Sequence, residues 1–169
     1  IAAPRDVTTR WLVPRLALVA AADPELRFRL IAADQPLDFT EANLDLAIRW
    51  VADAGDLEGM AIDDGLMANI APAVAPGPFT ICWGDSNARV DDSMAAMHVG
   101  DAGLAIDAVA GGLGQARVPA LLAIPDLALG AIVEKDARTK GAAAYWLVAP
   151  TPQWRQKKVR ALVAALLGD

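Results

Sequence analysis

Short apolar segments that switch between helical and strand periodicity open this chain, and they restrict its fold more than any other feature. Residues 1–3 are apolar and extended. From Val7 to about Ala22 the apolar residues recur at helical spacing, and Pro14 is expected to kink this helix. Residues 26–31 and 44–49 alternate between apolar and polar side chains, as strands with one wet face do. The order strand, helix, strand, strand predicts a parallel α/β sheet.

The rest of the chain continues this mixed pattern. Residues 51–64 are rich in Gly and Asp and are expected to form a loop. Apolar or alternating segments predict strands at 66–75, 79–83, 96–99, 115–118, 130–133 and 145–148. Helices are expected at 102–110, from residue 119 for a short stretch, and at 153–167.

Length and charge exclude several function classes. The chain has 169 residues, enough for one domain or two small lobes. It is 55% hydrophobic with a mean hydropathy of +0.33, which excludes a disordered tail or a polar linker. The net charge of -6 is repelled by nucleic-acid phosphates and by anionic lipid, so direct contact with DNA or a membrane is not expected.

Compartment follows from cysteine usage and from the lack of targeting segments. Cys82 is the single cysteine, so an intrachain disulfide is impossible. No apolar core of a signal peptide opens the chain, and its longest uncharged run, residues 65–84, contains three prolines. We therefore expect a soluble, cytoplasmic domain. Because residue 1 is Ile1 rather than methionine, we also expect the chain to be a fragment or a processed product.

Catalytic chemistry is difficult to assemble from these residues. His98 is the only histidine, so a site rich in His or Cys is excluded and only a carboxylate metal site remains conceivable. The adjacent acids at 63–64 and 91–92 are better explained as solvated loop residues. The only serines, Ser86 and Ser93, lack the motif of a nucleophile elbow. Glycines at 111–114 follow a helix rather than a strand, which predicts a helix end and not a dinucleotide loop. No enzyme, cofactor or metal is predicted.

Loops at the carboxyl ends of the predicted strands remain as a binding site. Ligands of open parallel α/β sheets bind there, beside the free N–H groups of helix N-termini. Two interpretations of His98 are equally supported: it contacts a ligand at the end of its strand, or it is a half-buried structural residue. Gly84-Asp85 is a further loop that follows a predicted strand. The candidate ligand contacts are Arg5, Asp6, Val7, Thr8, Asp34, Arg49, Trp50, His98, Gly100 and Asp101. Together they predict a small-molecule site, lined by two lobes, without catalytic groups.

Several segments closely resemble the effector domain of LysR-type transcriptional regulators. The segments are TRWLVPRL (9–16), DP (23–24), LDF (37–39), DLAIR (45–49), IAPAV (70–74), 102–118 and 145–150. Coverage is nearly the whole chain, and the first fifty residues carry most of the specificity. The match is best for the branch that contains the glycine-cleavage activator and the regulator of chromosomal β-lactamase.

This resemblance implies a fold and a set of partners. It implies a two-lobed fold of the type 2 periplasmic-binding-protein kind, with two crossovers between lobes and an effector in the cleft between them. The expected domains are 1–70 as the first part of lobe I, 71–118 as lobe II, and 119–169 as the end of lobe II with the return to lobe I. It also implies antiparallel self-association as a dimer or tetramer, and DNA contact only through an N-terminal winged helix-turn-helix outside this chain.

Two departures from the family pattern sharpen these expectations. Asp6 stands where the family often has Ser or Thr at the effector, so we expect an effector that is neutral or presents a cationic or donor group to this carboxylate. Residues 76–101 are shorter than the family's second lobe, and its usual Trp-containing helix is missing from them.

The leading interpretation is thus the ligand-sensing and oligomerisation domain of a bacterial regulator, with the first helix and the 102–110 helix as interface candidates. A solute-binding protein of a transport system with the same fold is the alternative. An enzyme on this fold is disfavoured by the scarcity of Ser, His and Cys.

Overall fold

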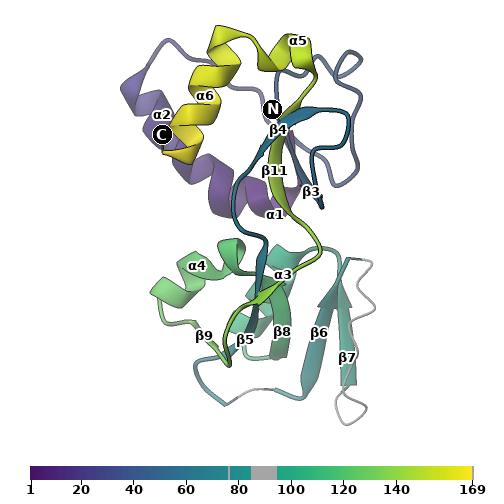
Figure 1. Ribbon diagram of the computed structural model, residues 1–169. Coiled ribbons are helices and arrows are strands. Elements are labelled where there is room, and N and C mark those ends of the chain that lie inside the picture. The colour runs from purple at the N-terminus through teal and green to yellow at the C-terminus, as the bar shows by residue number, and fades with distance from the viewer. Residues whose placement is uncertain (76, 85–94, 169) are drawn as a thin grey trace. The chain divides into compact units, whose positions relative to one another are not determined.

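The computed structural model describes residues 1–75, 77–84 and 95–168, which form two compact units (Figure 1). Unit 1 consists of Ile1–Asp64 and Ala142–Asp169, and unit 2 of Gly65–Gly141. The chain therefore passes from unit 1 to unit 2 and back once, which confirms the two-lobed α/β fold with two crossovers. The boundary expected between residues 70 and 71 falls inside a strand of unit 2, Leu66–Pro72.

A five-stranded sheet forms the centre of unit 1, with the order β2-β1-β3-β11-β4. Its strands are β1 (Ala2–Ala3), β2 (Ile31–Ala32), β3 (Ala47–Val51), β4 (Glu58–Ala61) and β11 (Ala144–Ala149). β1 pairs in parallel with both β2 and β3, as the pattern of the first fifty residues predicts. β11 returns antiparallel between β3 and β4, so the whole sheet is mixed.

Two sequence-based expectations for unit 1 are wrong. The strand expected at 26–31 is reduced to Ile31 and Ala32, which pair with the two residues of β1. The loop expected at 51–64 contains the strand β4, whose exposed edge position lacks the apolar signal of a core strand.

The first helical region has three parts: α1 (Arg5–Val7), the π-helix η1 (Thr8–Leu12) and α2 (Val13–Ala22). The expected distortion is present, but it precedes Pro14, which lies in the first turn of α2. Because Pro14 offers no N–H to the preceding turn, the helix widens there, and the Val13 amide bonds back to the Thr8 carbonyl. Burial lowers the pKa of Arg15, whose guanidinium stacks 4.5 Å from the Trp11 ring centroid.

Unit 1 is completed by α5 (Thr151–Trp154) and α6 (Lys157–Leu167), where a single helix over 153–167 was expected. Helices α2 and α6 pack against each other beside the sheet (Figure 1). Apolar side chains from the helices and the sheet form the core, including Leu12, Leu16, Ile48, Leu147 and Val163.

Unit 2 has a second sheet with the order β10-β5-β8-β6-β7, and β9 also pairs with β5. Its strands are β5 (Leu66–Pro72), β6 (Phe79–Trp83), β7 (Ala95–Val99), β8 (Gly114–Pro119), β9 (Ile132–Glu134) and β10 (Thr139–Lys140). β6 runs parallel to β7 and β8, whereas β5 is antiparallel to its neighbours. Residues 85–94 lie outside the part of the chain that the structure describes. The expectation that a Trp-containing helix is missing from residues 76–101 therefore stays a prediction.

Two helices pack on one face of this second sheet: α3 (Ala102–Ala110) and α4 (Ala120–Ala128). The helix at 102–110 is predicted without error. Gly111 ends it and Gly112 has a φ of 84°, which confirms that this glycine-rich segment is a helix end. Its Ile106 and Val109 are fully buried, so α3 contributes to the core of unit 2.

None of the helices in the described ranges has the length and apolar character that crossing a bilayer requires. Within the same residues, no cluster of three or more His, Cys, Asp or Glu side chains is arranged to hold a metal ion.

Candidate functional site

Asp6 forms the centre of a buried polar cluster in unit 1. It lies in the short helix α1, directly after β1, and is only 5% exposed. One carboxylate oxygen accepts the Val7 amide at 2.6 Å, and the other accepts the Tyr145 hydroxyl at 3.0 Å. Asp6 is not the residue that caps α1, because Pro4 occupies that position. Its carboxylate therefore joins the start of the first helix to the return strand β11.

Tyr145 is the member of this cluster that sequence reasoning missed. It is 1% exposed, and its ring lies 4.7 Å from the ring of Trp50, centroid to centroid. The antiparallel register pairs Tyr145 with Trp50, and paired residues point to the same face of a sheet. A signal was present in the sequence: Tyr145 is the only tyrosine, it stands in an apolar strand, and a buried hydroxyl needs a partner. We call Asp6, Trp50 and Tyr145 the Asp6 cluster.

The residues around Asp6 differ in accessibility. Thr8 is buried and donates its hydroxyl to the Pro4 carbonyl at 2.8 Å, and Val7 is fully buried. Arg5 is exposed. Thr8 also begins the π-helix, a distortion that is frequent at functional sites. Arg5 is thus the accessible cation at this end of the helix, while Val7 and Thr8 support the site from within.

Asp34 follows the carboxyl end of β2 and is exposed. Because β2 is parallel to β1, the end of β2 and the beginning of α1 lie at the same edge of the sheet. The structure therefore brings Asp34 to the edge that carries Arg5 and Asp6.

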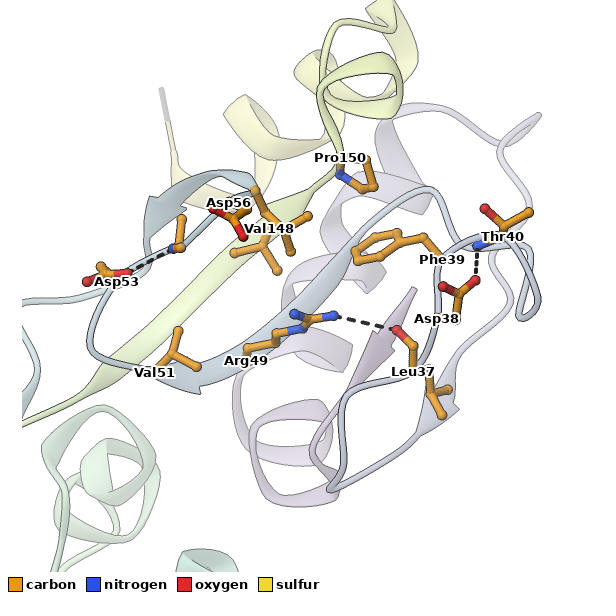
Figure 2. Close-up of a pocket in the computed structure, with 13 residues that line it drawn as sticks. Leu37, Asp38, Phe39, Thr40, Arg49, Val51, Asp53, Asp56, Val148 and Pro150 are labelled. Atoms are coloured by element: carbon orange, nitrogen blue, oxygen red, sulfur yellow. Dashed lines mark hydrogen bonds between the residues drawn. The ribbon is translucent and has the colours of Figure 1, made fainter.

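Arg49 is separated from Trp50 although the two are adjacent in β3. Successive side chains of a strand point to opposite faces, so Arg49 faces away from Tyr145. It contributes to a cavity of about 540 Å³ lined by residues 37–40 and 53–57 together with strand residues and Pro150 (Figure 2). We call this cavity the Arg49 pocket.

Three further predicted contacts, His98, Gly100 and Asp101, belong to unit 2. Asp101 is the N-cap of α3, and its carboxylate accepts the Leu104 amide at 2.7 Å. His98 is exposed on β7, opposite the buried Cys82 of β6. Their assignment as effector contacts stays a prediction. Gly84 is exposed at the end of β6, whereas Asp85, both serines and the acids at 91–92 lie outside the described residues.

This arrangement is suited to recognition. The Asp6 cluster places a carboxylate, a phenol hydroxyl and an indole within one small region at the carboxyl edge of the parallel strands. Hydrogen bonds to both carboxylate oxygens fix the geometry of the cluster.

The fold recurs in solved structures, although no protein-family model and no curated protein matches the sequence. The effector binding domain of AmpR from Citrobacter freundii has a TM-score of 0.79 at 15% identity, over 99% of this chain and 94% of that one. The regulatory domain of CrgA, a LysR-type transcriptional regulator from Neisseria meningitidis, has a TM-score of 0.76 at 14% identity, over 99% and 95%. Full-length AphB from Vibrio cholerae, a member of the LTTR family, has a TM-score of 0.71 at 16% sequence identity, over 99% of this chain and 66% of that one. At these identities the similarity shows the fold.

Proposed function

We propose that this chain is the ligand-sensing domain of a bacterial LysR-type transcriptional regulator, of the branch related to the glycine-cleavage activator. The single observation that carries the proposal is the Asp6 cluster, which lies at the carboxyl edge of the parallel strands in a fold that effector binding domains share. In this role the domain binds its effector without converting it.

The partners of Asp6 refine the chemistry expected of that effector. Both carboxylate oxygens already accept hydrogen bonds inside unit 1, so a donor group of the effector has to share or replace the Tyr145 hydroxyl. The half-buried Trp50 offers an aromatic surface beside this point, and the exposed Arg5 offers a cation. An effector with an apolar or aromatic body and a donor group fits this combination.

A thermal-shift screen with amino acids, aromatic acids and cell-wall fragments tests the proposal. A ligand present at about 100 times its Kd stabilises the folded chain by about 2.7 kcal/mol, which raises the melting temperature by several degrees. We expect Trp50→Leu to weaken the binding of a ligand found in the screen about tenfold or more, because it removes the aromatic surface. Trp154→Leu in α5 is expected to leave the affinity unchanged. Conversion of the hit, measured by mass spectrometry, contradicts a purely sensing role.

Self-association is the second part of the proposed function, and the exposed apolar residues support it. On α2, Leu18 is 73% exposed and Val13 is also exposed. At the end of α4, Leu129 is 82% exposed and Ile124 is exposed as well. The other interface candidate, α3, directs its apolar residues into the core of unit 2 and exposes only Leu104 among its large side chains. We therefore propose α2 and α4 as the surfaces that bind a second copy.

Leu18→Glu is expected to weaken the self-association of the chain at least about tenfold, because a charge replaces an apolar contact. Sedimentation velocity over a concentration series measures the change. Val74→Glu is the matched control, since Val74 is 75% exposed and the substitution adds the same charge outside α2 and α4. A chain that is monomeric at every concentration, or an equal effect of both variants, overturns this part of the proposal.

Contact with DNA is proposed for a separate domain of the complete protein. The chain matches nearly all of an effector binding domain but about two thirds of full-length AphB, which is consistent with a regulator that has a further domain. DNA footprinting of the complete protein with and without a hit from the screen distinguishes a regulator from a solute-binding protein.

A further inference from the structure

The Arg49 pocket has a charge arrangement that the proposed function does not use. Arg49 is half-buried and points into the cavity from β3, on the sheet face opposite the Asp6 cluster. Its one hydrogen bond to a described residue goes to the Leu37 carbonyl, at a long 3.5 Å. Its guanidinium also lies 5.6 Å from the centroid of the Phe39 ring. Most of its N–H donors are therefore available, in a planar fork that matches a carboxylate.

Three carboxylates border the same pocket, and they differ in how they are used. One Asp38 oxygen accepts the amides of Thr40 and Glu41, and one Asp53 oxygen accepts the amide of Gly55. Asp56 is exposed and makes no hydrogen bond or ion pair with any described residue. Figure 2 shows Asp56 and Val148 along one side of the pocket and Phe39 along the other, with Arg49 between them.

The combination selects for a ligand that carries both charges. With one cation and three carboxylates, the pocket repels a simple anion, and Arg49 opposes a simple cation. A molecule with a carboxylate and an ammonium group satisfies Arg49 and Asp56 together. Phe39, Leu57, Val148 and Pro150 supply apolar walls for the rest of the molecule. The cavity volume lies in the range of about 300–1,000 Å³ that is usual for small-molecule sites.

We propose that the Arg49 pocket binds an α-amino acid with an apolar side chain. Its carboxylate pairs with the Arg49 guanidinium, its ammonium group lies at the Asp56 carboxylate, and its side chain packs against Phe39 and Val148. This site is separate from the Asp6 cluster, because the two lie on opposite faces of the sheet in unit 1. The inference therefore stands whether or not the proposed function holds.

Isothermal titration of the 169-residue chain with L-leucine tests this inference. Two analogues each lack one charge: L-leucinamide has no carboxylate, and 4-methylpentanoate has no ammonium group. We expect L-leucine to bind and each analogue to bind about tenfold more weakly or worse, because each leaves one protein charge without its partner. Equal binding of 4-methylpentanoate, or no heat with L-leucine, L-methionine and L-phenylalanine at millimolar concentrations, overturns the proposal.

Variants assign the ligand to this pocket. Arg49→Gln and Asp56→Asn are each expected to weaken the binding of L-leucine about tenfold or more. Arg160→Gln and Glu25→Gln remove an exposed charge of the same sign elsewhere in unit 1 and are expected to change nothing. Circular dichroism and the urea midpoint show that each variant is folded. If Trp50→Leu abolishes binding while Arg49→Gln leaves it intact, the ligand occupies the Asp6 cluster, and the Arg49 pocket is not its site.

Discussion

Asp6→Ala is expected to lower the free energy of unfolding of unit 1 by about 3 kcal/mol. The substitution removes the carboxylate that accepts hydrogen bonds from two buried donors, the Val7 amide and the Tyr145 hydroxyl. An unsatisfied buried donor costs about 1–3 kcal/mol. Urea unfolding followed by tryptophan fluorescence measures the loss, and hydrogen exchange of β11 amides assigns it to unit 1.

Tyr145→Phe separates the contribution of the hydroxyl from that of the carboxylate. It removes one hydrogen bond to a buried Asp6 oxygen, so we expect a loss of about 2 kcal/mol, typical of a hydrogen bond to a carboxylate. The double variant is expected to lose about 1.5 kcal/mol less than the sum of the single losses, because the two residues act through the same bond.

Asp34→Ala is the matched control, since Asp34 is an exposed carboxylate at the same edge of the sheet. Its effect should stay within about 0.5 kcal/mol. If Asp6→Ala also stays within that range, the hydrogen bonds of the Asp6 cluster do not hold α1 to β11.

Gly114→Ala is expected to destabilise unit 2 by about 3 kcal/mol or more. Gly114 begins β8 and pairs with Phe79 of β6. A Cβ atom at residue 114 would lie 1.9 Å from the Phe79 carbonyl oxygen and 2.7 Å from its carbonyl carbon. These are backbone atoms, so no side-chain rotation relieves the overlap, and the strands have to separate. Urea unfolding and hydrogen exchange of the β6 and β8 amides measure the effect.

Gly100→Ala provides the control within the same unit. A Cβ atom at residue 100 meets nothing within 4 Å, and the backbone there does not require glycine. We expect a change within about 0.5 kcal/mol. Equal stability of the two variants would mean that β6 and β8 tolerate a wider spacing at this point.

Periodicity in the sequence predicted much of the architecture correctly. The helix at 102–110 and the strand at 79–83 were predictable because their apolar residues face one core and because Asp101 and Gly111 mark the helix ends. Residues 26–31 have the same alternation as a strand, yet most of them do not pair, because the neighbouring strand is too short. Strand β4 was missed for the opposite reason: it pairs with β11 but exposes most of its side chains.

The candidate site was only partly predictable. The sequence identified Asp6, Arg49 and Trp50 as residues near strand ends, but it placed them in one site. The tertiary structure assigns Trp50 and Arg49 to opposite faces of the sheet and adds Tyr145 from 139 positions further along the chain than Asp6. No local pattern contains such a pairing, because it depends on β11 returning beside β3.

The sequence by itself therefore determined much of the local structure: which side chains are apolar and where most of the helices and strands form. Residue propensities, hydrophobic periodicity and helix-end signals act over a few neighbouring residues, so they can be recognised in the sequence without knowledge of the tertiary contacts. Only the tertiary structure decided which polar groups meet. The register of β11 against β3 gave Asp6 its buried partner and left Arg49 facing a cavity, because pairing across a sheet is set by the whole core of the unit.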